Sequence, residues 1–171
     1  DEPGVLYPVG EDKVIWWSDE TGWGHLYLSS TDGETTQLTT GDWVAIDAIH
    51  VDEDTETIFF TRQLSEAEGN PYHVAVSNVS LNGNDLRTLT EMPGYRTTTR
   101  NNFSPSGKFF IDNVSSDDNP GISFLRTSDG KIVSSFEKAA VKNLKALGFV
   151  PPETFTVTAA DGEAKLWGRL L

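Results

Sequence analysis

The 171-residue chain contains no cysteine, so it can form neither a disulfide bond nor a thiolate metal site. Basic residues are scarce: 13 Lys and Arg stand against 26 Asp and Glu, which gives a formal net charge of -13. Because nucleic-acid binding requires clustered positive charge, this balance argues against a nucleic-acid partner. No apolar run approaches the length of a transmembrane helix, so we expect no membrane segment.

Aromatic residues, in contrast, are plentiful. They make up 11% of the chain and include five Trp and nine Phe, within a hydrophobic content of 37%. This is rich enough for a packed core and excludes a disordered segment. The length alone would suit one domain.

The most informative positive feature is a unit that occurs three times. Each copy has an aromatic-rich strand, a second strand, an Asp-Gly or Asn-Gly turn and a short polar strand. The turn glycines, Gly33, Gly83 and Gly130, are separated by 50 and 47 positions. A period of this size with such hairpin turns is typical of β-propeller blades. We therefore predict an all-β fold: a partial β-propeller of about three four-stranded antiparallel blades.

Residues 41–92 show the four-strand count most clearly. Alternation and β-branched or aromatic residues predict strands at about 43–51, 58–62, 72–80 and 85–90. The repeats at about 1–40 and 93–136 follow the same plan, and the inner strand of the last is expected near 95–103. Three blades are too few to close the usual ring of four to eight. We therefore expect bare blade faces and, with them, a homo-oligomer.

The repeat ends at residue 136. Apolar residues at helical spacing over 137–147 predict a short linker helix, which Gly148 and the following prolines would end. We interpret 137–152 as a linker helix and Pro-rich seam between domains. Residues 153–171 are predicted to form a C-terminal hairpin outside the repeat, at the start of another domain.

Four stretches follow one another in an order that a known family shares. In the longest, Ile15 to Leu28, an Ile-Trp strand, a turn and a His-Leu-Tyr-Leu strand succeed one another, and 37–43, 103–109 and 158–162 fit as well. The chain thereby resembles the dipeptidyl peptidase IV branch of the prolyl oligopeptidase serine peptidases. This family carries an eight-bladed propeller over an α/β-hydrolase domain, so the resemblance implies that 153–171 begin the hydrolase domain of a longer parent protein.

The resemblance also implies a function. The parent would be a serine exopeptidase that removes N-terminal dipeptides from peptide substrates, with Pro or Ala favoured at the second position, and an extracytoplasmic or periplasmic location is favoured. The family's Ser-Asp-His triad, and the Glu pair that binds the free N-terminus, have no matching position in this sequence. We therefore expect a non-catalytic propeller fragment that serves as scaffold and substrate-access region, with no catalytic, cofactor-binding or metal residue of its own.

Residues that could suggest chemistry have simpler interpretations. Ser123 follows a Gly-Ile pair but lacks the second glycine of a Gly-x-Ser-x-Gly nucleophile elbow and falls in a predicted strand. His25 and His73 head third strands at what we interpret as equivalent repeat positions. With His50, they are therefore expected to lie apart rather than to converge on a metal.

Two other features have structural interpretations. Asp52, Asp54 and Glu56 alternate as in a calcium loop, but Thr57 stands where the EF-hand pattern requires glycine, so a solvated turn is expected. Trp23 lies in a glycine-flanked turn and is expected to be exposed, and a ligand-binding role is the less favoured interpretation.

Two rival hypotheses stay open. The chain could be a non-catalytic β-propeller protein-binding module, against which the hairpin outside the repeat argues. It could also be a self-sufficient β-sandwich, against which the repeat period argues. Both ends of the chain are interpreted as cuts in a longer protein, since the first residue is Asp1 rather than Met.

Overall fold

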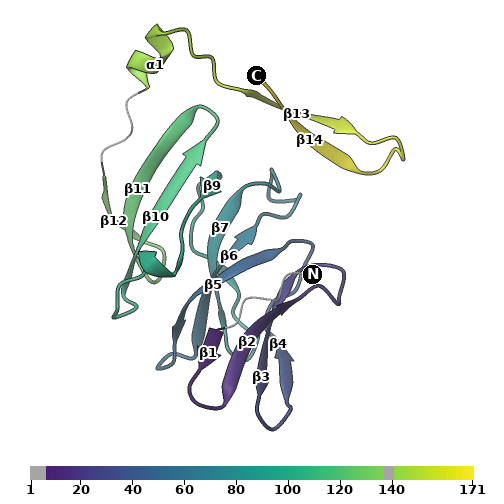
Figure 1. Cartoon of the computed structure of the whole chain (residues 1–171), viewed down its shortest axis with the longest axis vertical. Coiled ribbons are helices and arrows are strands. Elements are labelled where there is room, and N and C mark those ends of the chain that lie inside the picture. The colour runs from purple at the N-terminus through teal and green to yellow at the C-terminus, as the bar shows by residue number, and fades with distance from the viewer. Residues whose placement is uncertain (1–6, 137–140) are drawn as a thin grey trace.

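The computed structural model describes residues 7–136 and 141–171. The described residues form three four-stranded antiparallel sheets, a two-stranded hairpin and one short α-helix. The three sheets lie next to one another in chain order, and the hairpin lies beyond the ends of the second and third sheets (Figure 1). This confirms the predicted fold class, an all-β partial propeller with a short helix and a C-terminal hairpin.

Each sheet is an antiparallel meander in chain order, and we call the three sheets blades 1, 2 and 3. Blade 1 consists of β1 (Tyr7–Val9), β2 (Lys13–Ser18), β3 (His25–Ser30) and β4 (Thr35–Gln37). Blade 2 consists of β5 (Ala45–Asp52), β6 (Thr57–Gln63), β7 (Val74–Ser80) and β8 (Arg87–Thr88). Blade 3 consists of β9 (Tyr95–Arg96), β10 (Phe109–Ser116), β11 (Asn119–Thr127) and β12 (Ile132–Ser135).

Burial along the second strands shows which blade faces are covered. In β6, Ile58, Phe59 and Phe60 are successive residues and all are buried, so blade 2 is covered on both faces. In β10 burial alternates: Phe110 is 1% exposed and Phe109 is 39% exposed. Since successive side chains point to opposite faces of a sheet, blade 3 has one open face.

Two hydrophobic clusters lie between neighbouring blades. The larger joins blades 1 and 2 and consists of Val9, Ile15, Leu26, Leu38, Trp43, Ala45, Ala48, Val51, Ile58, Phe60 and Val79. The smaller joins blades 2 and 3 and consists of Ile49, Phe59, Val76, Leu89 and Phe110, with Phe103 packed against it. The core is therefore built from face-to-face packing of sheets rather than from the interior of one sheet.

The inner strand of blade 3 is shorter than the predicted 95–103. It is limited to β9, and a 3₁₀ turn, η1 (Arg100–Asn102), follows. The Asn102 side-chain oxygen accepts hydrogen bonds from the Thr99 backbone N–H at 2.8 Å and from the Thr99 hydroxyl at 3.0 Å. Such local side-chain bonds compete with the ladder and turn the chain away from the sheet.

Over the part of the linker that the structure describes, 141–147, the helix is also shorter than predicted. The structure has α1 (Lys142–Ala146), and residues 137–140 of the predicted helix lie outside the described residues. Gly148 follows with φ +88 and donates its N–H to the Lys145 carbonyl at 3.0 Å, which ends the helix as expected of a glycine cap. Along the described ranges, the structure has no helix long and apolar enough to cross a membrane.

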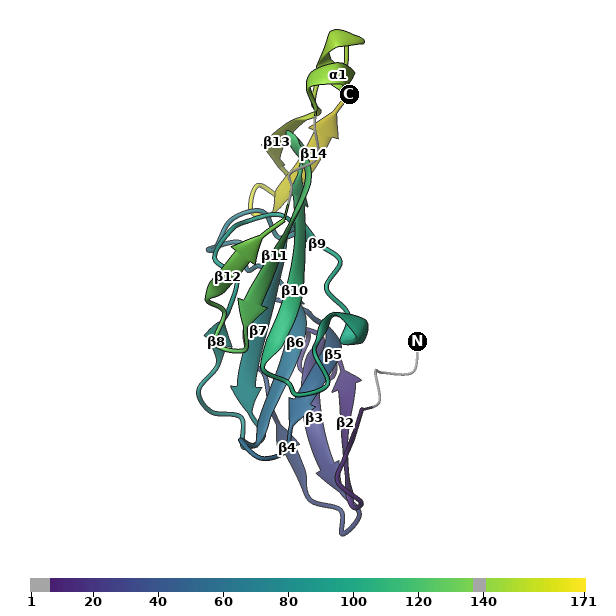
Figure 2. The same ribbon diagram turned by 90° about the vertical axis from the view of Figure 1, so that its left-hand side faces the viewer.

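The C-terminal hairpin forms as predicted. Its strands β13 (Glu153–Thr158) and β14 (Lys165–Leu170) pair in antiparallel register. The Asp161 carboxylate accepts the backbone N–H groups of Glu163 at 2.9 Å and Ala164 at 3.0 Å, which fixes the turn. Seen edge-on, α1 and the hairpin extend the molecule beyond one end of the blades (Figure 2).

Candidate functional site

The candidate site is the seam where the hairpin meets blade 3, and Asp117 is its centre. Asp117 lies in the turn between β10 and β11, and its carboxylate accepts a hydrogen bond from the Thr154 hydroxyl at 2.6 Å. It also forms an ion pair with Arg169. Thr154 and Arg169 face each other across the β13–β14 ladder. One carboxylate on blade 3 therefore holds both strands of the hairpin.

Two further contacts support the seam. The Arg169 guanidinium carbon lies 5.4 Å from the centre of the Tyr95 ring on β9, within cation–π range. Lys165 on β14 lies 3.7 Å from a carboxylate oxygen of Glu66 in the loop after β6. Both side chains of the Lys165 pair are about half exposed, so this pair contributes little stability. The Asp117 carboxylate is only 17% exposed, so its contacts with the hairpin are better shielded from solvent than the Lys165 pair.

A groove of about 310 Å³ runs along the seam. Its walls carry three aromatic rings, from Tyr72, Tyr95 and Trp167, and its polar groups come from Asn70, Thr154 and Arg169. Within the described part of the chain, the Trp167 indole N–H has no hydrogen-bond partner although it is shielded from solvent. Aromatic faces with a few donors are what a peptide or an adjoining domain surface would contact.

A histidine links the seam to the interior of the blades. The His73 ring meets the Tyr95 ring edge-on, with centroids 5.0 Å apart. Burial lowers the pKa of His73 below its usual value, Asp117 opposes this shift, and Arg96 adds to it. His73 is therefore a neutral packing residue at neutral pH.

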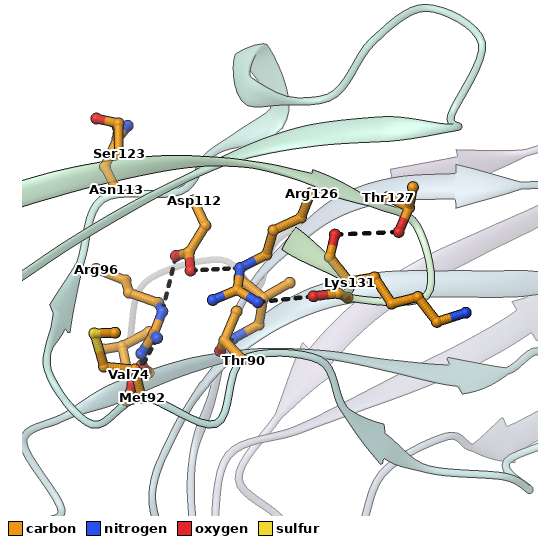
Figure 3. A network of polar contacts seen from close by, with 12 residues as sticks. Val74, Thr90, Met92, Arg96, Asp112, Asn113, Ser123, Arg126, Thr127 and Lys131 are labelled. Carbon is orange, nitrogen blue, oxygen red and sulfur yellow. Dashed lines mark hydrogen bonds and ion pairs between the residues drawn. The ribbon is translucent and has the colours of Figure 1, made fainter. Parts of the chain in front are cut away.

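Arg96 belongs to a buried charge network in blade 3 (Figure 3). Asp112 on β10 is fully buried, and its two carboxylate oxygens accept hydrogen bonds from Arg96 Nε and Arg126 Nε, each at 2.9 Å. Burial lowers the pKa of Arg96 and the Asp112 charge opposes this. Because an isolated buried charge is costly, each of the three groups depends on the others.

The same network ties blade 3 to blade 2. Arg96 donates to the Val74 carbonyl on β7 and, at 2.6 Å, to the Met92 carbonyl in the chain between the blades. Arg126 donates to the Gly130 carbonyl in the β11–β12 turn at 2.7 Å. The network therefore fixes how the two blades sit against each other, and with them the position of Tyr95 and the groove.

Blade 2 has its own buried arginine, Arg62 on β6. It binds Glu68 through two hydrogen bonds of 2.8 and 2.6 Å and lies over the Trp43 ring at 4.9 Å. The hydrogen bonds from Arg62 lower the pKa of Glu68 to about 2. Glu68 belongs to the loop that carries Asn70 and Tyr72, so Arg62 holds the loop that forms one wall of the groove.

The residues singled out from the sequence lie apart from this groove, except for His73. Ser123 lies on β11, and its hydroxyl donates to the Asn113 side chain at 2.6 Å across the ladder. His25 lies between the Thr39 hydroxyl at 3.2 Å and the Gly41 carbonyl at 3.0 Å, and burial lowers its pKa. His50 stacks on Phe103 at 4.9 Å.

One expectation about the histidines was wrong. His25 and His73 do not occupy equivalent repeat positions: His25 opens β3, whereas His73 precedes β7. They lie eight and ten residues before their turn glycines, Gly33 and Gly83. The longer loop before β7 shifts the register, and the sequence repeat is too degenerate there to reveal the shift.

The acidic turn and the exposed tryptophan are as expected. Asp52 accepts the backbone N–H groups of Asp54 and Thr55, both at 3.1 Å, which is the geometry of an Asx-type turn. Trp23 is 43% exposed. Asp52 therefore fixes a surface turn of blade 2, and Trp23 lies exposed on a turn of blade 1.

The residues that build the seam and the network were missed from the sequence. The sequence does contain one indication of the network. Arg126 follows Phe124 by two positions, so the two side chains lie on the same face of β11, the face that carries the apolar Phe124. An arginine on the apolar face of a strand is expected to be buried. This expectation does not identify Asp112, fourteen residues away, as its partner.

Comparison with known proteins identifies the relatives of the chain. A family model described as the dipeptidyl peptidase IV (DPP IV) N-terminal region matches residues 2–121. "Dipeptidyl peptidase 4" of Trichophyton rubrum is 27% identical over 128 residues, which cover 71% of this chain and 15% of that protein. "Probable dipeptidyl peptidase 4" of Arthroderma benhamiae has the same identity and coverage.

A solved structure shares the fold. The crystal structure of Porphyromonas gingivalis dipeptidyl peptidase 4 matches with a TM-score of 0.78 and 20% identity, over 96% of this chain and 23% of that one. The chain therefore spans about 15% of the length of the curated relatives it matches and about a quarter of this structure.

Proposed function

The chain belongs to the dipeptidyl peptidase IV N-terminal-region family, and we propose on that premise that it is the propeller part of a serine dipeptidyl peptidase. The observation that carries the proposal is the family match over residues 2–121, most of the three blades. The parent removes N-terminal dipeptides, with Pro or Ala at the second position. It does so by acyl transfer through a serine ester.

Within that parent, the chain is scaffold and substrate-access region rather than catalyst. Its buried charged groups Arg96, Asp112 and Arg126 form a network that holds blade 3 against blade 2. Rigid blades around a hydrolase site restrict which peptides reach it, because only an extended chain passes a narrow opening. The catalytic serine, aspartate and histidine lie on the hydrolase domain of the parent.

We also propose a division of the chain into domains. The partial propeller covers 1–136, with blades at about 1–40, 41–92 and 93–136, the seam covers 137–152, and the hydrolase domain starts at 153–171. Two observations support this division. The hairpin pairs with itself rather than with a blade, and Thr154 and Arg169 attach it to blade 3 through polar contacts with Asp117. A polar interface of this kind is typical of contacts between domains.

A peptidase assay tests the proposed function. The purified 171-residue chain is incubated with a Gly-Pro chromogenic substrate and is expected to show no turnover. The longer polypeptide that contains it is expected to cleave the same substrate, and a serine-directed inhibitor should abolish that cleavage. Inhibitor-sensitive turnover by the short chain would contradict its non-catalytic role. Absence of turnover in the longer polypeptide would favour the rival hypothesis, a non-catalytic protein-binding propeller.

The isolated chain also self-associates in this proposal. Ile132, Val133 and Phe136 on blade 3 are each at least 50% exposed. A closed ring of blades buries such residues against the next blade, and exposed apolar faces of this kind mark association sites.

A further inference from the structure

The first strands of all three blades meet at one side chain, that of Arg100. Arg100 opens η1, shortly after β9 of blade 3. Its Nε donates a hydrogen bond to the Ala48 carbonyl on β5 of blade 2 at 3.1 Å. Its guanidinium carbon lies 4.6 Å from the centre of the Tyr7 ring on β1 of blade 1, within cation–π range. Arg100 therefore contacts the first strand of each of the other two blades.

These contacts span more of the fold than the other contacts between blades described above. Each hydrophobic cluster joins two neighbouring blades, and Arg96 reaches from blade 3 to Val74 in the adjacent blade 2. Arg100 reaches past blade 2 to Tyr7 in blade 1. Blades 1 and 3 are not neighbours, so Arg100 couples two blades that do not pack against each other.

A carboxylate on β5 adds to the set. Burial raises the pKa of Asp47, and the positive charge of Arg100 opposes that shift. Each group thereby favours the charged form of the other. A guanidinium suits this position because its flat face can lie on an aromatic ring while its edge donates hydrogen bonds, which an ammonium group does not reproduce.

The position of Arg100 corresponds to the inner wall of a propeller. Propeller blades stand around a central channel, and the convergence of β1, β5 and η1 on Arg100 marks the side of the fold that faces it. Arg100 is exposed, as are Ile46 on β5 and Thr97 directly after β9. Further blades would extend this wall around the channel rather than cover it.

We propose that Arg100 clamps the channel wall across three successive blades and thereby helps to determine which peptides the parent accepts. The proposal rests on the proposed function, in which the chain is a substrate-access region. Loss of the clamp lets the first strands of blades 1 and 3 shift at the channel. Because the catalytic triad lies on the hydrolase domain, the effect falls on substrate entry and binding and not on the chemical step.

A double-mutant cycle on the 171-residue chain tests the clamp. Arg100→Gln removes the cation and Tyr7→Leu removes the ring. The folding equilibrium constants of the two single variants and the double variant, from urea denaturation, should show a coupling of at least about threefold between the two sites. Arg87→Gln is the matched control, because Arg87 is an exposed arginine on β8 of blade 2. Its coupling with Tyr7→Leu should stay within about twofold.

Kinetics of the longer polypeptide test the role in access. Two substrates are compared, the Gly-Pro chromogenic substrate and a longer peptide that begins with the same two residues. Arg100→Gln should change KM for the longer peptide by more than about twofold, while kcat and the KM of the short substrate stay within about twofold of wild type. Arg87→Gln should leave the constants of both substrates within the same limit.

The two experiments fail in different ways. A coupling between Arg100 and Tyr7 no larger than that of the Arg87 control would overturn the clamp, whatever the activity of the longer polypeptide. Equal KM changes for the two substrates, or none, would overturn the role in access. A longer polypeptide without peptidase activity would contradict the proposed function and with it the role in access, whereas the coupling would still support or refute the clamp.

Discussion

Replacing Asp112 by Asn should destabilise the chain strongly, although the two side chains have nearly the same shape. The Asp112 side chain is 0% exposed, and the side chains of its partners Arg96 and Arg126 are 1% and 7% exposed. Asn keeps the shape but removes the charge. Only one of its two terminal atoms accepts a hydrogen bond, so its NH₂ group would face an Nε–H donor.

The expected loss of unfolding free energy follows from the two arginines, which stay buried without their carboxylate partner. Two buried guanidinium groups would share one neutral acceptor in place of a carboxylate. Breaking a buried ion pair by removing one partner typically costs about 3–5 kcal/mol. Against the roughly 5–15 kcal/mol total stability of a folded domain, this is a large fraction. Because Arg96 also binds blade 2, blade 3 should loosen first.

Urea denaturation monitored by circular dichroism measures this effect. The control is Asp129→Asn, which removes a 2.7 Å ion pair with Lys131 whose side chains are 54% and 81% exposed. The control should lower the unfolding free energy far less, because exposed ion pairs contribute little stability. If Asp112→Asn cost no more than Asp129→Asn, the argument that buried charge holds blades 2 and 3 together would fail.

Three further results are expected. Asp117→Ala should release the hairpin, so amide exchange in β13 and β14 should accelerate while that of β10 does not; unchanged exchange would show that Asp117 does not hold the seam. Arg62 lowers the pKa of Glu68 to about 2, so this pair stabilises the fold above the ordinary carboxylate pKa and is lost as the pH falls through about 2. Glu68→Gln should therefore melt below wild type at about pH 6 and converge with it near pH 2, and a pH-independent gap would contradict this linkage. Gly24→Ala would push a methyl group into the Trp17 ring and should cost about 1–3 kcal/mol in urea unfolding; a neutral effect would mean that the ring moves freely.

The blades could be predicted from the sequence because their signals are local. Gly33, Gly83 and Gly130 mark hairpin turns that need positive φ, and the aromatic strands lie at similar distances before them. Repetition then identifies three units of one kind. The linker helix and the C-terminal hairpin were predictable for the same reason, since Gly148 and the Asp161-Gly162 turn specify their own backbone conformation.

The seam and the charge network could not be predicted because they depend on how blades pack. Asp117 lies 37 residues from Thr154, and nothing local to either residue indicates the other. The short inner strand of blade 3 has a related cause. The plan of the repeat placed a strand near 95–103, but the Thr99–Asn102 hydrogen bonds form a turn that the repeat does not reveal.

The most direct test of the central claim is the coding sequence beyond Leu171. If the chain is the propeller part of a serine dipeptidyl peptidase, the following region should encode an α/β-hydrolase domain. A Gly-x-Ser-x-Gly motif should then appear within about 250 residues, the upper size of a typical domain, followed by Asp and then His. A stop codon shortly after Leu171, or a downstream domain without that order, would contradict the account and leave the non-catalytic propeller as the better explanation.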